Sequence, residues 1–406
     1  MAGRNDCDVL IAGGGNVGLA LAAALQQQGF SAAVVEGRPP QAPATVPDVG
    51  LRVSALSIGS RRFLEHLKAW PASDRRGPTA YQNMQVESRD GRGCVNFSAH
   101  EQGLPALGWI VDNEHLRATL WQRCQQLGVS LHEGVQVTEV QSKSRSVSAQ
   151  LDNGQSLRAQ LLAAADGARS PIRQQLGFEL EERPYEQQAI VAVVNTERAN
   201  QGLAWQRYLA SGPLAFLPIS GGRSSIVWTL EAEQAQRLMA ADDNQFMAEL
   251  QAASVHQFGP ITAIGQRAVF PLSLMLAKRY VHERVFLVGD AAHRIHPQAG
   301  QGLNIGLQDA AAMAELLTEQ GEVPTQAVTL ERLLRRYERW RRSDDELMVR
   351  GVDRIGQTLR GDSVAAQWAG IGLSLVDRLP PLKGLFLRHA AGTERGAPKW
   401  FRRPVK

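Results

Sequence analysis

A strand, a glycine-rich turn and a helix follow one another near the start of the chain. Residues 8–12 (DVLIA) form an apolar run typical of a buried central strand, and residues 19–28 continue as a helix rich in alanine and leucine. The six residues between them, GGGNVG at 13–18, match the spacing G-x-G-x-x-G. A second strand over 31–35 ends at Glu36. This order predicts a βαβ unit and hence a Rossmann-like α/β fold.

Each glycine of this turn has a distinct expected role. Gly13 would make the tight turn, Gly15 would let the backbone approach a pyrophosphate, and Gly18 would let helix and strand pack closely. The carboxylate of Glu36 would accept hydrogen bonds from an adenosine ribose, and it disfavours the 2′-phosphate of NADP. The turn therefore predicts a dinucleotide site, but it does not separate NAD from FAD.

A second informative stretch lies at 285–309, VFLVGDAAHRIHPQAGQGLNIGLQD. Its apolar start predicts a buried strand that ends at Gly289 and Asp290. A loop with His296 and Pro297 follows, and the last third has apolar residues at helical spacing. An acid at the end of a strand and the free N–H groups of a helix start suit a polar, electron-rich cofactor.

A third strand end lies between these two motifs. The apolar run 161–165 ends at Asp166 and Gly167, after which Ser170 suits an N-cap and Pro171 the first helical position. Taken alone, an Asp-Gly pair is most often a plain turn. As one of three ordered strand ends, it predicts a further contact with the same ligand.

The three motifs, in this order, resemble those of the FAD-dependent aromatic hydroxylases, the single-component flavoprotein monooxygenases. Within that group HPQAGQGLN at 296–304 is similar to the motif of the ubiquinone-biosynthesis hydroxylases, and segments 51–56 and 109–113 resemble theirs too. The tail at 371–380 resembles the branch that hydroxylates 2-polyprenylphenol. The resemblance covers nearly the whole chain. One departure is Gln298, where the relatives usually carry an apolar residue.

The resemblance implies a Rossmann-like FAD-binding domain of the aromatic hydroxylase type, an inserted β-sheet substrate domain and a helical C-terminus. We expect a discontinuous FAD-binding domain, a substrate domain whose strands are rich in β-branched and apolar residues, and a C-terminal helical segment. The expected ranges are 1–72, 106–177 and 278–345 for the first, 73–105 and 178–277 for the second, and 346–406 for the third.

The implied reaction uses FAD as cofactor, NAD(P)H as transient reductant and O2. It places one oxygen atom on the ring of a polyprenylated phenol in ubiquinone biosynthesis, with the C5 position favoured by the tail. Because the cofactor supplies the difficult chemistry, the protein needs geometry and a dry site more than a catalytic triad. The sequence agrees, since it contains no G-x-S-x-G, no H-E-x-x-H and no Cys/His metal spacing.

Three residues are catalytic candidates by this resemblance. Arg52 would lie beside the flavin, where a guanidinium positions the ring and attracts nucleotide phosphate. Pro297 would fix its loop against the flavin face. His296 is a candidate general base, although bracing the loop is the stronger expectation, and His293 is a weaker candidate still. The expected cofactor contacts are Gly13, Gly15, Gly18, Glu36, Arg52, Asn113, Asp166, Gly167, Gly289, Asp290, Pro297, Gly300, Gly302, Leu303 and Asn304.

Composition sets the expected compartment. The 44% hydrophobic and 21% charged residues are those of an ordinary globular protein. Cys7, Cys94 and Cys124 show no CxxC spacing, which favours free thiols in a reducing cytoplasm. The first 30 residues do not form a signal peptide, and no apolar run approaches the roughly 18 residues of a membrane span.

Positive charge is concentrated near the C-terminus. Residues 331–406 contain 17 Lys and Arg against 9 Asp and Glu. The plain interpretation is a solvated helix face; the sharper one is peripheral contact with the inner membrane or with other ubiquinone-biosynthesis proteins. Nucleic acid is not expected, because no binding motif accompanies the charge, and a homo-oligomer stays open. The arginines expected mostly on one helix face are Arg332, Arg335, Arg336, Arg339, Arg341 and Arg342.

Two other functions remain open from the sequence. A hydroxylase of a small soluble aromatic compound would carry cationic residues on its substrate sheet, and Arg207 and Arg223 keep this alternative alive. A low-turnover flavoprotein scaffold of a ubiquinone-biosynthesis complex is the other. A polyprenyl substrate needs an apolar channel. The aromatic residues that could line one, or simply fill the core, are Trp205, Phe216, Trp228 and Phe270.

Overall fold

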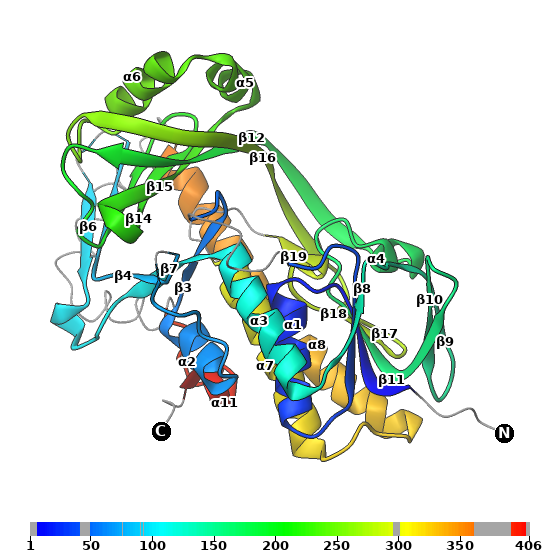
Figure 1. Cartoon of the computed structure of the whole chain (residues 1–406). Helices are drawn as coiled ribbons and strands as arrows, with labels where there is room; N and C mark the ends of the chain where they lie inside the picture. The colour runs from blue at the N-terminus through cyan, green and yellow to red at the C-terminus, as the bar shows by residue number, and fades with distance from the viewer. Residues whose placement is uncertain are drawn as a thin grey trace.

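The computed structural model describes residues 6–40, 49–74, 76–89, 91, 93–294, 301–360 and 391–402, with only the backbone described for 347–360. The described chain forms a mixed α/β part and a β-sheet part, and Figure 1 shows the second above the first. The expected α/β architecture with a separate β-sheet and a helical C-terminal region is confirmed.

The lower part is built around a mostly parallel sheet of order β17-β18-β11-β1-β2-β8. The predicted βαβ unit is confirmed as β1, α1 and β2. A β-hairpin of β9 and β10 extends β11 at its amino end. The sheet strands are β1 (Cys7–Ala12), β2 (Ala32–Glu36), β8 (Ser130–Glu133), β9 (Val137–Ser142), β10 (Val147–Leu151), β11 (Ser156–Ala164), β17 (Val281–His282) and β18 (Val285–Leu287).

The helices of this part pack their apolar faces on the sheet and on one another. Helix α1 contacts both α3 and α7, and α7 contacts α8. Buried alanines of α1 and α7, together with the apolar strands of the sheet, form the larger of the hydrophobic cores. The helices are α1 (Asn16–Gln27), α2 (Ile58–His66), α3 (Asn113–Leu127), α4 (Pro171–Gln175), α7 (Gly302–Gln320), α8 (Ala327–Arg360) and α11 (Lys399–Arg402), and the turn η4 spans Gly289–Ala291.

The register of the parallel strands aligns their carboxyl ends. Ala12 at the end of β1 lies opposite Val35 of β2 and Ala164 of β11, and Ala164 lies opposite Leu287 of β18. The chain segments that leave these strands therefore start at one edge of the sheet. In doubly wound folds this edge is where ligands bind.

The upper part is an antiparallel-rich sheet of order β19-β16-β12-β15-β14-β13-β5-β6. Helices α5 (Ala232–Ala240) and α6 (Asp243–Ala253) cover its outer face (Figure 1). A small third sheet has three strands in the order β3-β7-β4. The strands are β3 (Val53–Leu56), β4 (Thr79–Tyr81), β5 (Asn83–Glu87), β6 (Cys94–Ser98), β7 (Gly108–Asp112), β12 (Leu180–Thr196), β13 (Leu203–Tyr208), β14 (Pro213–Ile219), β15 (Arg223–Glu231), β16 (Ile261–Ala277) and β19 (His293–Arg294).

The two faces of the upper sheet differ, and they separate the four aromatic residues named above. Trp205, Phe216 and Trp228 are buried in the core beneath α5 and α6, as the core-filling alternative expected. Phe270 lies on the opposite face of the sheet. It pairs with Ala189 of β12, and the next residue, Ile190, points into the core beneath α5 and α6. Because successive side chains of a strand point to opposite faces, Ala189 and Phe270 face away from these helices. The apolar pattern of the sequence alone did not show which of these aromatic residues face the helices.

Helix α8 agrees with the expected basic face except at Arg341. The helix runs unbroken through position 345, the expected end of the FAD-binding domain, and Arg341 is fully buried. Arg335 and Arg336 form ion pairs with glutamates, while Arg332 and Arg339 are exposed. Membrane or protein contact through this region stays a prediction. In the part of the chain that the structure describes, no helix has the length and apolar character of a membrane span.

Gly18 provides a test of the packing at the strand–helix junction. A Cβ on Gly18 would overlap the carbonyl oxygen of Gly13, whereas a Cβ on Gly15 would meet no described heavy atom within 4 Å. We expect Gly18→Ala to lower the free energy of unfolding by about 2 kcal/mol or more, although alanine normally favours a helix. Gly15→Ala should cost less than about 1 kcal/mol. Urea unfolding of the two apoproteins measures both values, and equal losses would contradict the predicted packing.

Candidate active site

Four predicted site segments meet at the carboxyl edge of the lower sheet. Gly13 follows β1, Glu36 ends β2, Asp166 follows β11 and Asp290 follows β18, and the aligned register places these strand ends side by side. A Cβ on Gly13 would lie 2.6 Å from the carbonyl carbon of Ala165. The convergence expected from the sequence is therefore present in the structure.

The glycine turn is tied to Glu36 and to Arg117. Glu36 Oε2 accepts a hydrogen bond from Gly14 N at 2.6 Å, and its Oε1 accepts from Arg38 N at 2.7 Å. Arg117 of α3 donates from Nε to Gly14 O at 2.8 Å and lies 3.4 Å from Glu36 Oε1. The sequence interpretation missed Arg117. Its position four residues after Asn113, on the same face of one helix, was the available signal.

Asn113 links the glycine turn to the segment of Arg52. Its backbone N–H donates to Arg52 O at 3.0 Å, and its carbonyl accepts from Asn16 Nδ2 at 3.2 Å. The oxygens Asn16 Oδ1, Asn113 Oδ1 and Asp166 Oδ1 are buried, and each lacks a hydrogen-bond partner among the described residues. Buried polar atoms in folded proteins normally have a partner, so these three oxygens suit donors from a bound ligand.

Asp166 is held in place from behind. Its Oδ2 accepts from Ile172 N at 3.3 Å, and the predicted N-cap is confirmed because Ser170 Oγ accepts from Arg173 N at 3.0 Å. Burial raises the pKa of Asp166, and the hydrogen bonds from Ser170 and Ile172 oppose this only in part. A ligand hydroxyl at the unpartnered Oδ1 would offset part of the cost of burying this carboxylate.

Three of the predicted glycines border open space. A Cβ on Gly15, Gly167 or Gly302 would meet no described heavy atom within 4 Å. Gly18 and Gly289 differ, because a Cβ there would touch the chain. The first group thus leaves backbone accessible along one edge, which is the surface that an extended, polar ligand requires.

Helix α7 starts at Gly302, as the sequence predicted, and the side chain of Asn304 has a structural role that the sequence did not show. The helix begins at Gly302, so its first N–H groups have no acceptor within the helix. Asn304 Oδ1 accepts from Ser57 N at 2.9 Å and from Ser60 Oγ at 2.7 Å, and its Nδ2 donates to Ala55 O at 2.8 Å. The side chain therefore ties α7 to α2, which leaves the backbone of Leu303 and Asn304 for the expected contact.

Arg52 reaches from the lower part toward the upper sheet. It is exposed, and its guanidinium lies 5.6 Å from the ring centroid of Phe270 on β16. Its catalytic role stays a prediction. His296, Pro297, Gln298 and Gly300 lie outside the described residues.

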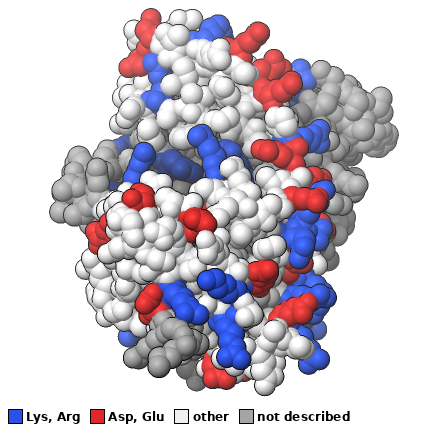
Figure 2. Space-filling view, turned by 90° about the vertical axis from the view of Figure 1, so that its right-hand side faces the viewer, with Lys and Arg blue, Asp and Glu red and all other residues white. Residues whose placement is uncertain are grey.

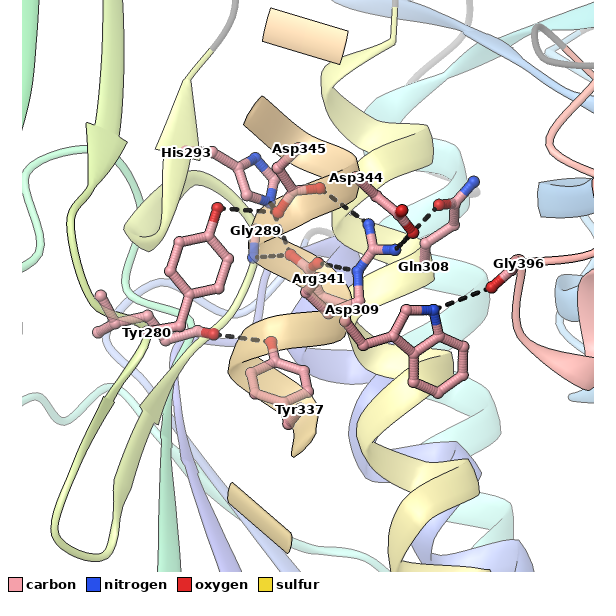
Figure 3. A network of polar contacts seen from close by, with 12 residues as sticks. Tyr280, Gly289, His293, Gln308, Asp309, Tyr337, Arg341, Asp344, Asp345 and Gly396 are labelled. Atoms are coloured by element: carbon pink, nitrogen blue, oxygen red, sulfur yellow. Dashed lines mark hydrogen bonds and ion pairs between the residues drawn. The ribbon is translucent and has the colours of Figure 1, made fainter. Parts of the chain in front are cut away.

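His293 belongs to a buried polar network rather than to open space (Figure 3). Its Nε2 lies 2.6 Å from Asp309 Oδ2 and 3.7 Å from Asp345 Oδ2. Burial alone would lower the pKa of His293, but the two carboxylates outweigh this effect and raise the pKa to about 9. A charged, fully enclosed imidazole is unsuited to take a proton from a substrate. This agrees with the expectation that His293 is a weaker candidate for the general base than His296.

Solved structures with the same fold define the class. The chain superimposes on p-nitrophenol 4-monooxygenase PnpA from Pseudomonas putida with a TM-score of 0.77, at 17% identity over 97% of this chain and 100% of that one. It also matches pqsL, a probable FAD-dependent monooxygenase from Pseudomonas aeruginosa, with a TM-score of 0.72 at 24% identity over 91% and 99%. The fold is that of the flavin-dependent monooxygenases.

Sequence relatives narrow the class to a family. Residues 6–351 match the family model described as FAD binding domain. The chain is 36% identical to the ubiquinone hydroxylase UbiL of Rhodospirillum rubrum over 97% of this chain and 91% of that protein. It is 31% identical to the 3-demethoxyubiquinol 3-hydroxylase of Escherichia coli over 95% and 98%. The chain belongs to this FAD-binding family of ubiquinone-biosynthesis hydroxylases and is an FAD-dependent monooxygenase.

Gly302 tests the electrostatic role of the α7 start. We expect Gly302→Asp to keep the apoprotein stable, because an acid in the first helical turn is favourable by about 0.3–1 kcal/mol. The same charge would repel an electron-rich flavin, so FAD binding should weaken at least about tenfold relative to Gly302→Asn, which has the same size. Titration of both apoproteins with FAD measures this, and equal affinities would contradict it.

The buried imidazole predicts how stability depends on pH. The pKa of His293 is raised from 6.5 in the unfolded chain to about 9, so its contribution is complete below pH 6.5 and is lost as pH rises toward 9. The free energy of unfolding should fall by about 1 kcal/mol per pH unit in this window. Urea unfolding should show a clearly smaller slope for His293→Gln and an unchanged one for the exposed His100→Gln. A flat wild-type profile would refute the charged imidazole.

Proposed function

We propose that the protein hydroxylates the aromatic ring of a polyprenylated phenol in ubiquinone biosynthesis, using O2 and NAD(P)H, with C5 as the favoured position. The names of the relatives support the pathway, and the resemblance of the tail supports the ring position. FAD, when bound, supplies the activation of O2 and the transfer of one oxygen atom to the ring. The protein supplies binding, orientation and exclusion of water.

The proposed place of FAD is the carboxyl edge of the lower sheet. Glu36 and Gly15 would hold the adenosine ribose and the pyrophosphate, Asp290 would meet the ribityl chain, and the N–H groups of α7 from Gly302 onward would face the ring. The unpartnered oxygens around Asp166 and the open glycines support this placement. In this place the partial positive charge of the helix start would favour negative charge on the ring.

The apolar inner face of the upper sheet is the observation that carries the substrate class. Ala215, Val227 and Val191 lie in register across three neighbouring strands, and Phe270 lies on the same face. These side chains are partly exposed, whereas those that alternate with them are buried under α5 and α6. A sheet face near Arg52 that presents these partly exposed apolar side chains suits a ring with a hydrocarbon chain.

The same face argues against a small aromatic acid. Arg207 is opposite Leu214, which belongs to the core beneath α5 and α6, so the guanidinium is on the other side of the sheet. Arg223 is the first residue of β15, six residues before Thr229. Thr229 pairs with Ala189, which on its other side pairs with Phe270. At about 3.3 Å per residue, this places Arg223 roughly 20 Å along the strand from the level of Phe270. Neither arginine is placed to pair with a carboxylate held near Phe270.

Charge on the surface supports a nucleotide as the electron donor. Figure 2 shows Lys and Arg side chains around a hollow between the upper and lower parts of the molecule. A cleft with charges of one sign raises the local concentration of an anion of the opposite sign. NAD(P)H, with its phosphates, is such an anion, and its transient docking there is part of the proposal.

Turnover with two substrates tests the proposal directly. The FAD-loaded enzyme, NAD(P)H and O2 are incubated either with a 2-polyprenylphenol or with 4-hydroxybenzoate, and the products are identified by mass spectrometry. We expect a hydroxylated polyprenylphenol, and we expect Val227→Glu to raise its KM by about tenfold or more because the variant places a charge on the apolar face. Oxidation of 4-hydroxybenzoate alone would favour the soluble-substrate alternative. No product from either would favour a scaffold.

A further inference from the structure

A buried network joins α7, α8 and the turn that carries Asp290 (Figure 3). Asp309 of α7 is at its centre: Oδ1 accepts from Arg341 Nε at 2.7 Å, and Oδ2 accepts from Gly289 N at 2.9 Å and lies 2.6 Å from His293 Nε2. Asp345, one helical turn after Arg341 on α8, accepts from Arg341 Nη2 at 2.9 Å. All four charged side chains are at most 1% exposed.

The carboxylates of the network are satisfied without a metal ion. His293, Asp309 and Asp345 place potential ligand atoms within 4.8 Å of one another, but the carboxylate oxygens already accept hydrogen bonds. Asp345 Oδ2, for example, accepts from Tyr280 OH at 2.8 Å. The guanidinium and the protonated imidazole balance the two carboxylates. A divalent cation would add uncompensated charge in a buried place, which is strongly unfavourable.

The network reaches the proposed flavin site through Gly289. This residue has a left-handed backbone (φ 59°), and a Cβ on it would lie 3.2 Å from Val17 of α1. Asp309 thus holds the turn from its buried side, while Asp290, the next residue, is exposed on the other side. Tyr337 of α8 adds a bond from its hydroxyl to Leu287 O at 2.8 Å, at the end of β18.

We propose that Arg341 is a positioning residue for the flavin: it fixes Asp309, and through Asp309 the Asp290 turn, in the geometry that binds the cofactor. The inference rests on the proposed FAD site. Only the planar guanidinium can donate to Asp309 and Asp345 at the same time from Nε and Nη2. Without this fork, the carboxylates of Asp309 and Asp345 lose their common donor, and the bond to Gly289 loses its fixed acceptor.

The test compares Arg341→Lys with Arg284→Lys. Arg284 is also buried, donates to the carbonyls of Lys143, Ser144 and Gln160, and directly precedes β18, at the opposite end of the strand from Gly289. Both variants keep the charge and lose the fork. Apoproteins shown to be folded by circular dichroism are titrated with FAD, and flavin fluorescence and the visible absorption bands are recorded. Urea unfolding of each apoprotein gives its stability.

Arg341→Lys should raise the Kd of FAD by about tenfold, the effect of weakening a charge-assisted hydrogen bond, and should change the bound spectrum. Arg284→Lys should keep Kd within about twofold of wild type whatever its stability. A wild-type Kd and spectrum in Arg341→Lys, or an equal rise of Kd in both variants, would overturn the proposal.

A second variant covers a failure of Arg341→Lys to fold. Asp345→Asn keeps one acceptor oxygen for Arg341, places an amide NH2 that can donate to the Tyr280 hydroxyl, and removes a carboxylate whose pKa burial already raises to about 6. We expect it to fold and to raise Kd by about two- to fivefold. An unchanged Kd in this variant would also overturn the proposal. These outcomes are independent of the substrate, so a failed hydroxylation assay leaves the binding test intact.

Discussion

The contact among α1, η4 and α7 is the constraint on which the rest of the structure depends. Val17 of α1 packs against the backbone of Gly289 and Gly306. A Cβ on Gly306 would lie only 2.6 Å from Cγ2 of Val17. Because both positions are glycine, the helix that follows the dinucleotide turn and the helix that follows β18 can approach closely. Two segments about 270 positions apart in the chain thereby form one ligand-binding edge.

The two sides of this edge differ in how their polar groups are satisfied. On the open side, the Oδ1 atoms of Asn16, Asn113 and Asp166 have no partners in the part of the chain that the structure describes, and the glycines leave backbone uncovered. On the buried side, both carboxylate oxygens of Asp309 accept hydrogen bonds, and the guanidinium of Arg341 is paired with the carboxylates of Asp309 and Asp345. A site whose back is fixed and whose front has unused hydrogen-bonding capacity is preorganised for a ligand.

The sequence predicted the elements that depend on local patterns. The strands before Gly13, Asp166 and Gly289, and the cap at Ser170, follow from apolar runs and turn chemistry, and the structure confirms them. Tertiary relations were harder. Periodicity showed that aromatic residues share a sheet, but not that Trp205 faces α5 and α6.

Arg341 shows the same limit for charge. An arginine on a basic helix is expected to be solvated, and only the partners from α7 and from one turn further along α8 explain its burial. Asn304 is another such case, because its amide contacts residues near position 57, far away in the sequence. The residues next to Arg341 and Asn304 in the sequence do not indicate these partners.

Hydrogen exchange of the apoprotein with and without FAD tests most directly whether the separate segments hold one cofactor. The account predicts that added FAD slows exchange together at the Gly13 turn, at 166–170, at 289–292 and at the first turns of α7, since these amides would be enclosed by one ligand. Protection confined to the Gly13 turn, with the other three segments unchanged, would contradict it.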